Sequence, residues 1–270
     1  MKKTLLAVTL AALTSGAATT ALAQPKAPEP DYTISGNFGI FSDYRFRGIS
    51  QTDLKPAVQG GFDFAHKSGF YLGNWNSNIA SNTAVNGNIE MDFYGGYKFE
   101  AVGVGFDVGT IYYSYPGAGS NVTAGLATSP EDFDTHEVYF GASYGPLSLK
   151  TSYTVSDGYF GIARTYTAAG ANMTGTAKGT LYYDLSFATE IAPKTTVSAH
   201  VGYLDLDGVT GEFDITDFRV GISYDLGPAV LGLSAYSNDI GNNAKVAFTS
   251  ANASKKLYKD AVVISVSKTF

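Results

Sequence analysis

From residue 32 onward, hydrophobic and polar side chains alternate along the chain with a period of two. In the first run, YTISGNFGIFSDYRF, the residues Ile34, Phe38 and Ile40 fall on one face, while Ser35 and Asn37 fall on the other. Successive side chains of a β-strand point to opposite faces, so the run predicts a strand with one apolar and one polar face. Its length, about fifteen residues, exceeds the ~5–6 residues usual in soluble proteins.

Eleven further runs of this kind follow. The twelve lie near residues 32–46, 55–66, 69–79, 87–99, 102–114, 135–145, 147–156, 179–190, 195–204, 214–225, 229–238 and 257–270. Between them, short Gly- or Pro-containing turns alternate with longer segments rich in Ser, Asn, Thr, Gly and Ala. An even number of strands with short turns at one end and long loops at the other is typical of outer-membrane barrels.

Alternation alone does not say which face is buried, because a soluble sandwich would pack its apolar face inward. Three observations favour a membrane barrel, in which the apolar face meets lipid and the polar face lines the lumen. Nearly all charges within the runs lie on the polar face, the runs reach the ~9–11 residues of a tilted spanning strand, and the chain ends in an alternating strand that closes on Phe270. We therefore predict an all-β fold, a transmembrane antiparallel up-and-down β-barrel of about twelve strands over residues 32–270.

The residues before the first run have a different character. Lys2 and Lys3, an apolar stretch over 5–13 and a small-residue site ending at Ala23 predict a secretory signal peptide over 1–23. A Pro-rich leader is expected over 24–31. Removing the signal peptide leaves a net charge of about −8, which argues against nucleic-acid binding. The chain has no cysteine, which excludes thiol catalysis and zinc–thiolate sites.

One long stretch resembles a known family. The segments FSDYRFRGISQTDLKPAVQGGFDF and GFYLGNWNSNI, with the ending ISVSKTF, are similar to the TorF family of porins of Gram-negative bacteria. The resemblance extends over essentially the whole mature chain and is most specific over residues 39–79. It implies an outer-membrane barrel and brings no catalytic residues and no established substrate.

The segment SDYRFRG interleaves basic and aromatic residues. Placed at the outer mouth of a barrel, Arg45 and Arg47 would face carboxylates across a narrow lumen and set an ion preference. The alternative is that both arginines form lumenal ion pairs that rigidify the barrel. The residues predicted to line the pore and set its selectivity are Asp43, Arg45, Arg47, Glu90, Asp92, Lys98, Asp107, Glu137, Lys150, Asp184, Asp217 and Arg219.

Other candidate sites have weaker support. His200 is expected to point into the lumen on the same face as Ser198, but no hydrolase motif surrounds the pair. The acidic segment SPEDFDTHE does not match the ligand spacing of a calcium loop, so we interpret it as a solvated loop. The Gly-rich GVGFDVG lacks the spacing of a dinucleotide fingerprint. Aromatic residues near strand ends are interpreted as interface or mouth residues, namely Trp75, Tyr112, Tyr113, Tyr144 and Tyr224.

These patterns predict a function. We expect an outer-membrane channel for passive diffusion of small hydrophilic solutes or ions, with no enzyme activity, no cofactor and no metal. The expected partners are outer-membrane lipid and lipopolysaccharide, the solutes themselves, and the barrel assembly machinery through Phe270. Two alternatives remain: a narrow or plugged barrel with a structural or loop-mediated binding role, and, with weaker support, an outer-membrane hydrolase that uses His200.

Overall fold

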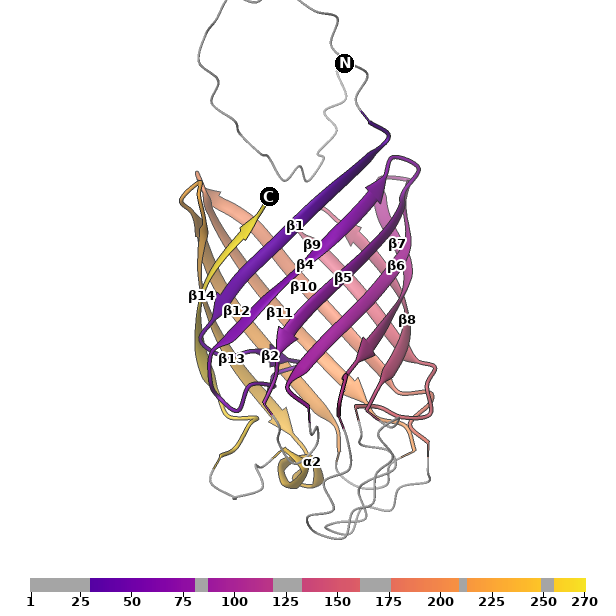
Figure 1. Cartoon of the computed structure of the whole chain (residues 1–270), viewed down its shortest axis with the longest axis vertical. Helices are drawn as coiled ribbons and strands as arrows, with labels where there is room; N and C mark the ends of the chain where they lie inside the picture. Colours follow the sequence, from indigo (N-terminus) through magenta and orange to yellow (C-terminus); the bar gives the residue numbers. More distant parts are fainter. Residues whose placement is uncertain (1–29, 81–86, 119–132, 161–175, 209–212, 249–254) are drawn as a thin grey trace, which may run out of the picture.

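The alternating runs form twelve antiparallel strands of one closed sheet in the computed structural model (Figure 1). The structure describes residues 30–80, 87–118, 133–160, 176–208, 213–248 and 255–270. The strands of the barrel are β1 (Tyr32–Phe41), β4 (Ala57–His66), β5 (Phe70–Asn78), β6 (Ile89–Ala101), β7 (Val104–Ser114), β8 (Thr135–Tyr144), β9 (Leu147–Thr154), β10 (Leu181–Ala192), β11 (Thr195–Asp205), β12 (Ile215–Asp225), β13 (Val230–Ile240) and β14 (Ala261–Thr269). The predicted fold class is confirmed.

Closure of the sheet occurs at β1. This strand pairs with β4 on one side, from Tyr32 opposite His66, and with β14 on the other, from Asn37 opposite Thr269. Every neighbouring pair of strands in the barrel is antiparallel and consecutive in order around it. A closed barrel leaves no strand edge unpaired, which satisfies the backbone hydrogen-bonding groups without water.

The connections also follow the predicted alternation. Short turns join β4 to β5, β6 to β7, β8 to β9, β10 to β11 and β12 to β13, and both ends of the described chain lie at this short-turn end (Figure 1). At the opposite, long-loop end lies the helix α2 (Asn242–Ala247). Among the described residues, no helix has the length and apolar character needed to cross a membrane.

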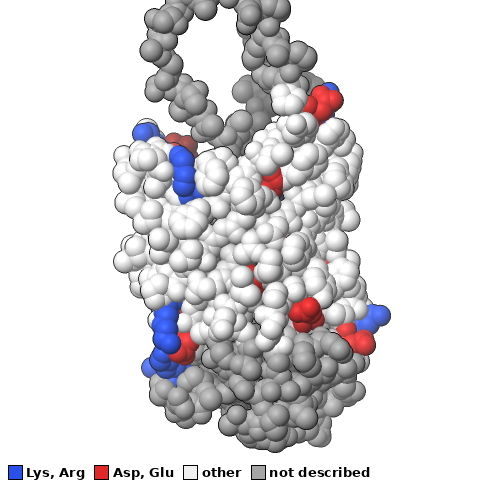
Figure 2. Space-filling view, viewed as in Figure 1, with Lys and Arg blue, Asp and Glu red and all other residues white. Residues whose placement is uncertain are grey.

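The outward face of the barrel is apolar. Ile34 is 65% exposed, Val220 60% and Ile264 62%, and each lies in a regular strand whose neighbours in sequence point inward. On the face seen in Figure 2, the visible lysines and arginines gather near the two ends of the barrel. Exposed Tyr144 and Tyr224 lie at short-turn ends of their strands, where interfacial aromatics are expected. This surface suits hydrocarbon rather than water, so we treat the barrel as membrane-spanning.

The buried hydrophobic side chains lie inside the barrel, toward its long-loop end. They form two clusters. The first contains Ile49, Tyr159, Tyr182, Leu204, Phe213, Ile215, Ile240 and Leu257, among others. The second contains Tyr44, Ala57, Ile79, Tyr113, Tyr115, Ala118 and Phe133. The long-loop half of the lumen is therefore filled by packed side chains.

Two sequence-based predictions need correction. The first strand was expected to reach Phe46, but β1 ends at Phe41 and the chain then turns into the lumen. As a result Tyr44 is buried inside the barrel rather than facing lipid. Trp75 also points inward, since it contacts Tyr44 edge-on at 5.4 Å between ring centroids. The predicted signal peptide and almost all of the predicted leader lie outside the described residues.

Candidate functional site: the lumen and its inward hairpin

Residues 42–56 fold into the lumen as an inward hairpin. Its two short strands, β2 (Arg45–Phe46) and β3 (Ile49–Ser50), pair antiparallel through a two-residue turn of Arg47 and Gly48. Both turn residues have positive φ, 46° and 77°, the combination that a tight type I′ hairpin turn requires. A Cβ atom on Gly48 would lie 1.8 Å from Oδ1 of Asn238 and 2.8 Å from Cβ of Asp217, so a larger residue there would force these wall side chains to shift.

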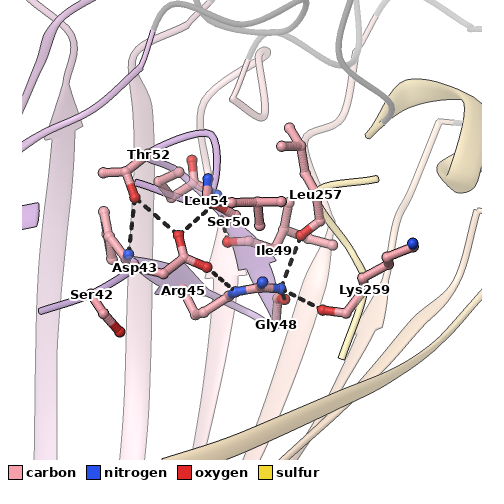
Figure 3. A network of polar contacts seen from close by, with 12 residues as sticks. Ser42, Asp43, Arg45, Gly48, Ile49, Ser50, Thr52, Leu54, Leu257 and Lys259 are labelled. Atoms are coloured by element: carbon pink, nitrogen blue, oxygen red, sulfur yellow. Dashed lines mark hydrogen bonds and ion pairs between the residues drawn. The ribbon is translucent and has the colours of Figure 1, made fainter. Parts of the chain in front are cut away.

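Arg45 holds the hairpin together and fastens it to the C-terminal part of the chain (Figure 3). Its Nε donates to Asp43 at 2.6 Å, while its Nη1 donates to the carbonyl oxygens of Gly48, Leu257 and Lys259 at 3.1, 3.0 and 2.8 Å. The Arg45 side chain is only 1% exposed. All of these acceptors belong to the hairpin or to the chain just before β14. Arg45 therefore stabilises the hairpin rather than presenting charge to a solute.

Further contacts tie the hairpin to the segment that precedes β14. The backbone N–H of Ser50 donates to the carbonyl of Leu257 at 3.0 Å, and Lys255 donates to the Asp53 carboxylate at 2.6 Å. Partial burial alone would raise the pKa of Asp53, but hydrogen bonds from Lys255 and Lys55 outweigh it and lower the pKa. Asp53 therefore stays ionised at neutral pH and keeps this tether.

Arg47 crosses the lumen to the opposite wall. Its two Nη atoms donate to the two carboxylate oxygens of Glu137 on β8 at 2.9 and 2.8 Å, and Nη1 also donates to the hydroxyl of Tyr159 at 2.5 Å. The guanidinium lies 4.1 Å from the ring centroid of Tyr182. Burial would lower the pKa of Arg47, but the facing charge of Glu137 raises it well above its ordinary value, so the guanidinium stays charged.

From Tyr182 the polar contacts continue along the wall. The Tyr182 hydroxyl donates to Asp217 at 2.9 Å, and Asp217 lies 2.9 Å from Nε2 of His200. The other ring nitrogen, Nδ1, lies 3.1 Å from Asp184. Both ring nitrogens of His200 thus face a carboxylate oxygen, an arrangement that favours the positively charged imidazolium, which donates from both nitrogens. Such an imidazolium has no free nitrogen to accept a proton, and the nearby Ser186 donates at 2.6 Å to Asp184 rather than to His200.

A second group of acidic residues lies beneath the hairpin on β6. Glu90 and Asp92 are 1% and 5% exposed, and Tyr115 donates to Glu90 at 3.1 Å. One oxygen of each carboxylate is buried and has no hydrogen-bond partner. Because Arg47 is engaged with Glu137, the described residues leave these two carboxylates without a cationic partner.

The short-turn half of the lumen is more open. A cavity of about 590 Å³ lies against β6 to β10, and Lys98, Asp107 and Lys150 line it. A second cavity of about 320 Å³ lies beneath the hairpin and is lined by Arg47, Arg219 and His200, among others. Both cavities share Lys150, Asp184 and Ser186, so they adjoin one another. Polar space therefore extends from the short-turn end to the underside of the hairpin.

The predicted site residues thus fall into two groups. Those near the hairpin are buried and mostly engaged, namely Asp43, Arg45, Arg47, Glu90, Asp92, Glu137 and Asp217. Those that line the two cavities without belonging to the first group are Lys98, Asp107, Lys150, Asp184 and Arg219, and the second cavity also reaches Arg45, Arg47 and Asp217. The expected meeting of arginine and carboxylate across the lumen is found for Arg47, whereas Arg45 pairs with Asp43 two residues away.

Sequence reasoning missed several participants. Tyr182, Tyr159 and Asn238 carry the contacts of the hairpin with the wall, and no motif marks them. Alternation did place His200 in the lumen, but not its position between two carboxylates. In the acidic segment, Glu131 and Asp132 lie outside the described residues, and Asp134 accepts hydrogen bonds from Tyr112 and from the backbone of Tyr115. Within the described ranges, no group of three or more His, Cys, Asp or Glu residues is arranged to hold a metal ion.

Comparison with known protein families identifies the family of this chain. A family model described as "Bacterial protein of unknown function (Gcw_chp)" matches residues 24–270. The chain belongs to the Gcw_chp family. No curated protein matches the chain. The description of the family names no activity, and the finer kinship with TorF-family porins stays a prediction.

Several solved structures of barrels are similar to this Gcw_chp protein. They include the KdgM porin in complex with disordered oligogalacturonate, at 9% identity and a TM-score of 0.46, covering 88% of this chain and 97% of that one. The NanC porin is 7% identical with a TM-score of 0.48, covering 88% and 98%. The COG4313 outer membrane channel from Pseudomonas putida F1 is 11% identical with a TM-score of 0.48, covering 92% and 99%. Such distant likeness carries no argument about function, which rests below on this chain's own residues.

Proposed function

We propose that this Gcw_chp protein is an outer-membrane channel through which small hydrophilic solutes or ions diffuse passively. The observation that carries the proposal is the polar space inside an apolar-faced barrel: cavities of about 590 and 320 Å³ that adjoin at Lys150, Asp184 and Ser186. A lumen that served only as a packed core would exclude water along its whole length. In this protein, packed side chains fill only the long-loop half of the lumen, and the two cavities lie in the rest of it.

In this proposal, the inward hairpin is the constriction. Its turn reaches the opposite wall through the Arg47–Glu137 pair, and its apolar residues Ile49 and Tyr44 each belong to one of the two buried clusters. A solute that enters from the short-turn end therefore meets the hairpin as the narrowest part of its path. The proposal implies a small conductance, well below that of a wide sixteen-stranded porin.

The same hairpin favours a second candidate function. Because its contacts are buried and numerous, residues 42–56 could close the lumen permanently and leave the barrel a structural or loop-binding role. Conductance separates the two functions, since only a channel passes ions.

The test is single-channel recording from the purified mature protein in planar lipid bilayers. We expect discrete steps of small conductance that scale with salt concentration, and liposome swelling that falls sharply with solute size. Bilayers that contain folded barrel, as judged by its heat-modifiable mobility on gels, yet show no current at any voltage would overturn the channel and support the closed barrel.

A further inference from the structure

The cationic side chains in the short-turn half of the lumen differ from the carboxylates in how they are engaged. Among the described residues, Lys98, Lys150 and Arg219 form no ion pair with a carboxylate. One oxygen of each nearby carboxylate accepts a hydrogen bond from a neighbouring hydroxyl: Tyr71 donates to Oδ1 of Asp107 at 2.7 Å, and Ser186 donates to Oδ1 of Asp184 at 2.6 Å. The charged groups of these three residues therefore remain available to an anionic solute.

Two of these cations are positioned by aromatic rings. The ammonium nitrogen of Lys98 lies 4.7 Å from the ring centroid of Tyr71, and that of Lys150 lies 5.4 Å from the ring centroid of Tyr139. The face of an aromatic ring attracts a cation and accepts no conventional hydrogen bond in return. Each ammonium is thus held against the wall while its N–H groups stay free to donate into the cavity.

The strand register places a row of polar side chains beside these lysines. Ser143 lies opposite Ser148, Ser148 opposite Ser186, and Ser186 opposite His200, which in turn lies opposite Arg219. These positions form one inward-facing row over β8 to β12. The exposed hydroxyls of Ser143 and Ser148 line the cavity that Lys98 and Lys150 also line.

Charge along this wall is positive in a protein that is acidic as a whole. Asp184 and Asp217 both face His200, which is itself charged, so part of their charge is neutralised locally. Lys150 and Arg219 then lie on either side of this group, and the hairpin above brings the Arg47–Glu137 pair, which is neutral as a unit. An anion that enters the cavity meets hydroxyl donors and cationic groups that outnumber the carboxylates, namely Lys98, Lys150, Arg219 and His200 against Asp107, Asp184 and Asp217.

We propose that this wall is a weak binding site for small hydroxyl-bearing carboxylates and makes the channel anion-selective. Ammonium and guanidinium groups bind the carboxylate, and the serine hydroxyls bind the hydroxyl groups. Affinity must stay in the millimolar range for the solute to leave again. The anion selectivity rests on the proposed channel function, whereas the binding of carboxylates does not depend on it.

The first experiment measures selectivity in planar bilayers under a salt gradient. Wild-type protein is expected to favour chloride over potassium, and Lys98→Gln with Lys150→Gln should lower the anion-to-cation permeability ratio at least fivefold. Lys194→Gln is the matched control, because Lys194 is exposed in the turn between β10 and β11 and should leave the ratio unchanged. A cation-selective wild type, or a double variant with the wild-type ratio, would overturn the inference.

The second experiment needs no conduction. Saturation-transfer NMR on the detergent-solubilised protein, with gluconate as probe and sorbitol as its uncharged counterpart, should detect gluconate alone. The double variant should lose that signal while it keeps its heat-modifiable gel mobility, and Lys194→Gln should keep both. If no current flows but this pattern holds, the channel function fails and the site stands. Equal signals from gluconate and sorbitol, or from wild type and double variant, would refute the site.

Discussion

At the scale of single residues, two arginines of the same short segment perform different tasks. Arg45 donates hydrogen bonds to Asp43 and to three backbone carbonyls, so its guanidinium links the hairpin to itself and to the segment that precedes β14. Arg47 extends from the turn and forms a bidentate pair with Glu137, and both side chains are almost completely buried. A buried charge that loses its partner is costly, because water cannot replace the lost contact. The Arg47–Glu137 pair therefore holds the turn of the hairpin against the opposite wall.

This pair gives a direct stability prediction. Arg47→Met or Glu137→Leu alone should lower the free energy of unfolding by about 3–5 kcal/mol, since each leaves one buried charge unpaired. The double variant should recover most of the loss, because it removes both charges together. Urea unfolding in lipid vesicles of the wild type, the two single variants and the double variant gives the coupling energy of the pair.

The exposed Lys67–Asp31 pair is the matched control. Its side chains are 69% and 58% exposed, and a solvent-exposed pair should show a coupling energy of only about 0–1 kcal/mol. A coupling for Arg47 and Glu137 that is no larger than this control would show that the cross-lumen pair does not hold the hairpin.

At the scale of elements, the inward hairpin separates what the sequence could predict from what it could not. The strands were predictable because lipid requires an uninterrupted alternation, and each of the twelve predicted runs overlaps one strand of the barrel. The end of β1 was not predictable, because Tyr44 and Phe46 continue the period-two pattern and yet pack inside the barrel. Burial in the lumen and contact with lipid both select an apolar side chain, so the pattern cannot separate them.

The candidate site was predictable to a similar extent. Alternation identified side chains such as Glu137 and Lys150 as lumenal, because a charge on the lipid face would be costly. It could not tell that Glu137 is paired and Lys150 is not, since pairing depends on where a folded-back loop places Arg47. Signals for that fold-back are present only as Gly48, which permits the positive φ of the turn.

Excising the hairpin tests its role as an element. Phe41 and Ala57 are register partners in the β1–β4 pair, so an Asn-Gly turn can replace residues 42–56 without a shift in register. We expect the barrel to fold, with lower stability because the two buried clusters lose Ile49 and Tyr44. Single-channel conductance should rise severalfold. A folded, excised barrel that conducts like the wild type would show that the constriction lies elsewhere.

At the scale of the whole molecule, the account depends on which face of the sheet meets water. The chain encloses its polar side chains and exposes its apolar ones, the reverse of a soluble protein. This arrangement is stable only where hydrocarbon surrounds the barrel. The packed long-loop half, the cavities of the short-turn half and the proposed anion site all follow from the same orientation.

Accessibility of a spin label along β12 measures that orientation most directly. The chain contains no cysteine, so single cysteines at Phe218, Arg219, Val220, Ile222 and Ser223 can each carry a nitroxide in vesicles without background labelling. We predict that labels at 218, 220 and 222 are relaxed mainly by lipid-soluble oxygen, and labels at 219 and 223 mainly by a water-soluble nickel chelate. The opposite phase, or no alternation along the strand, would contradict the account.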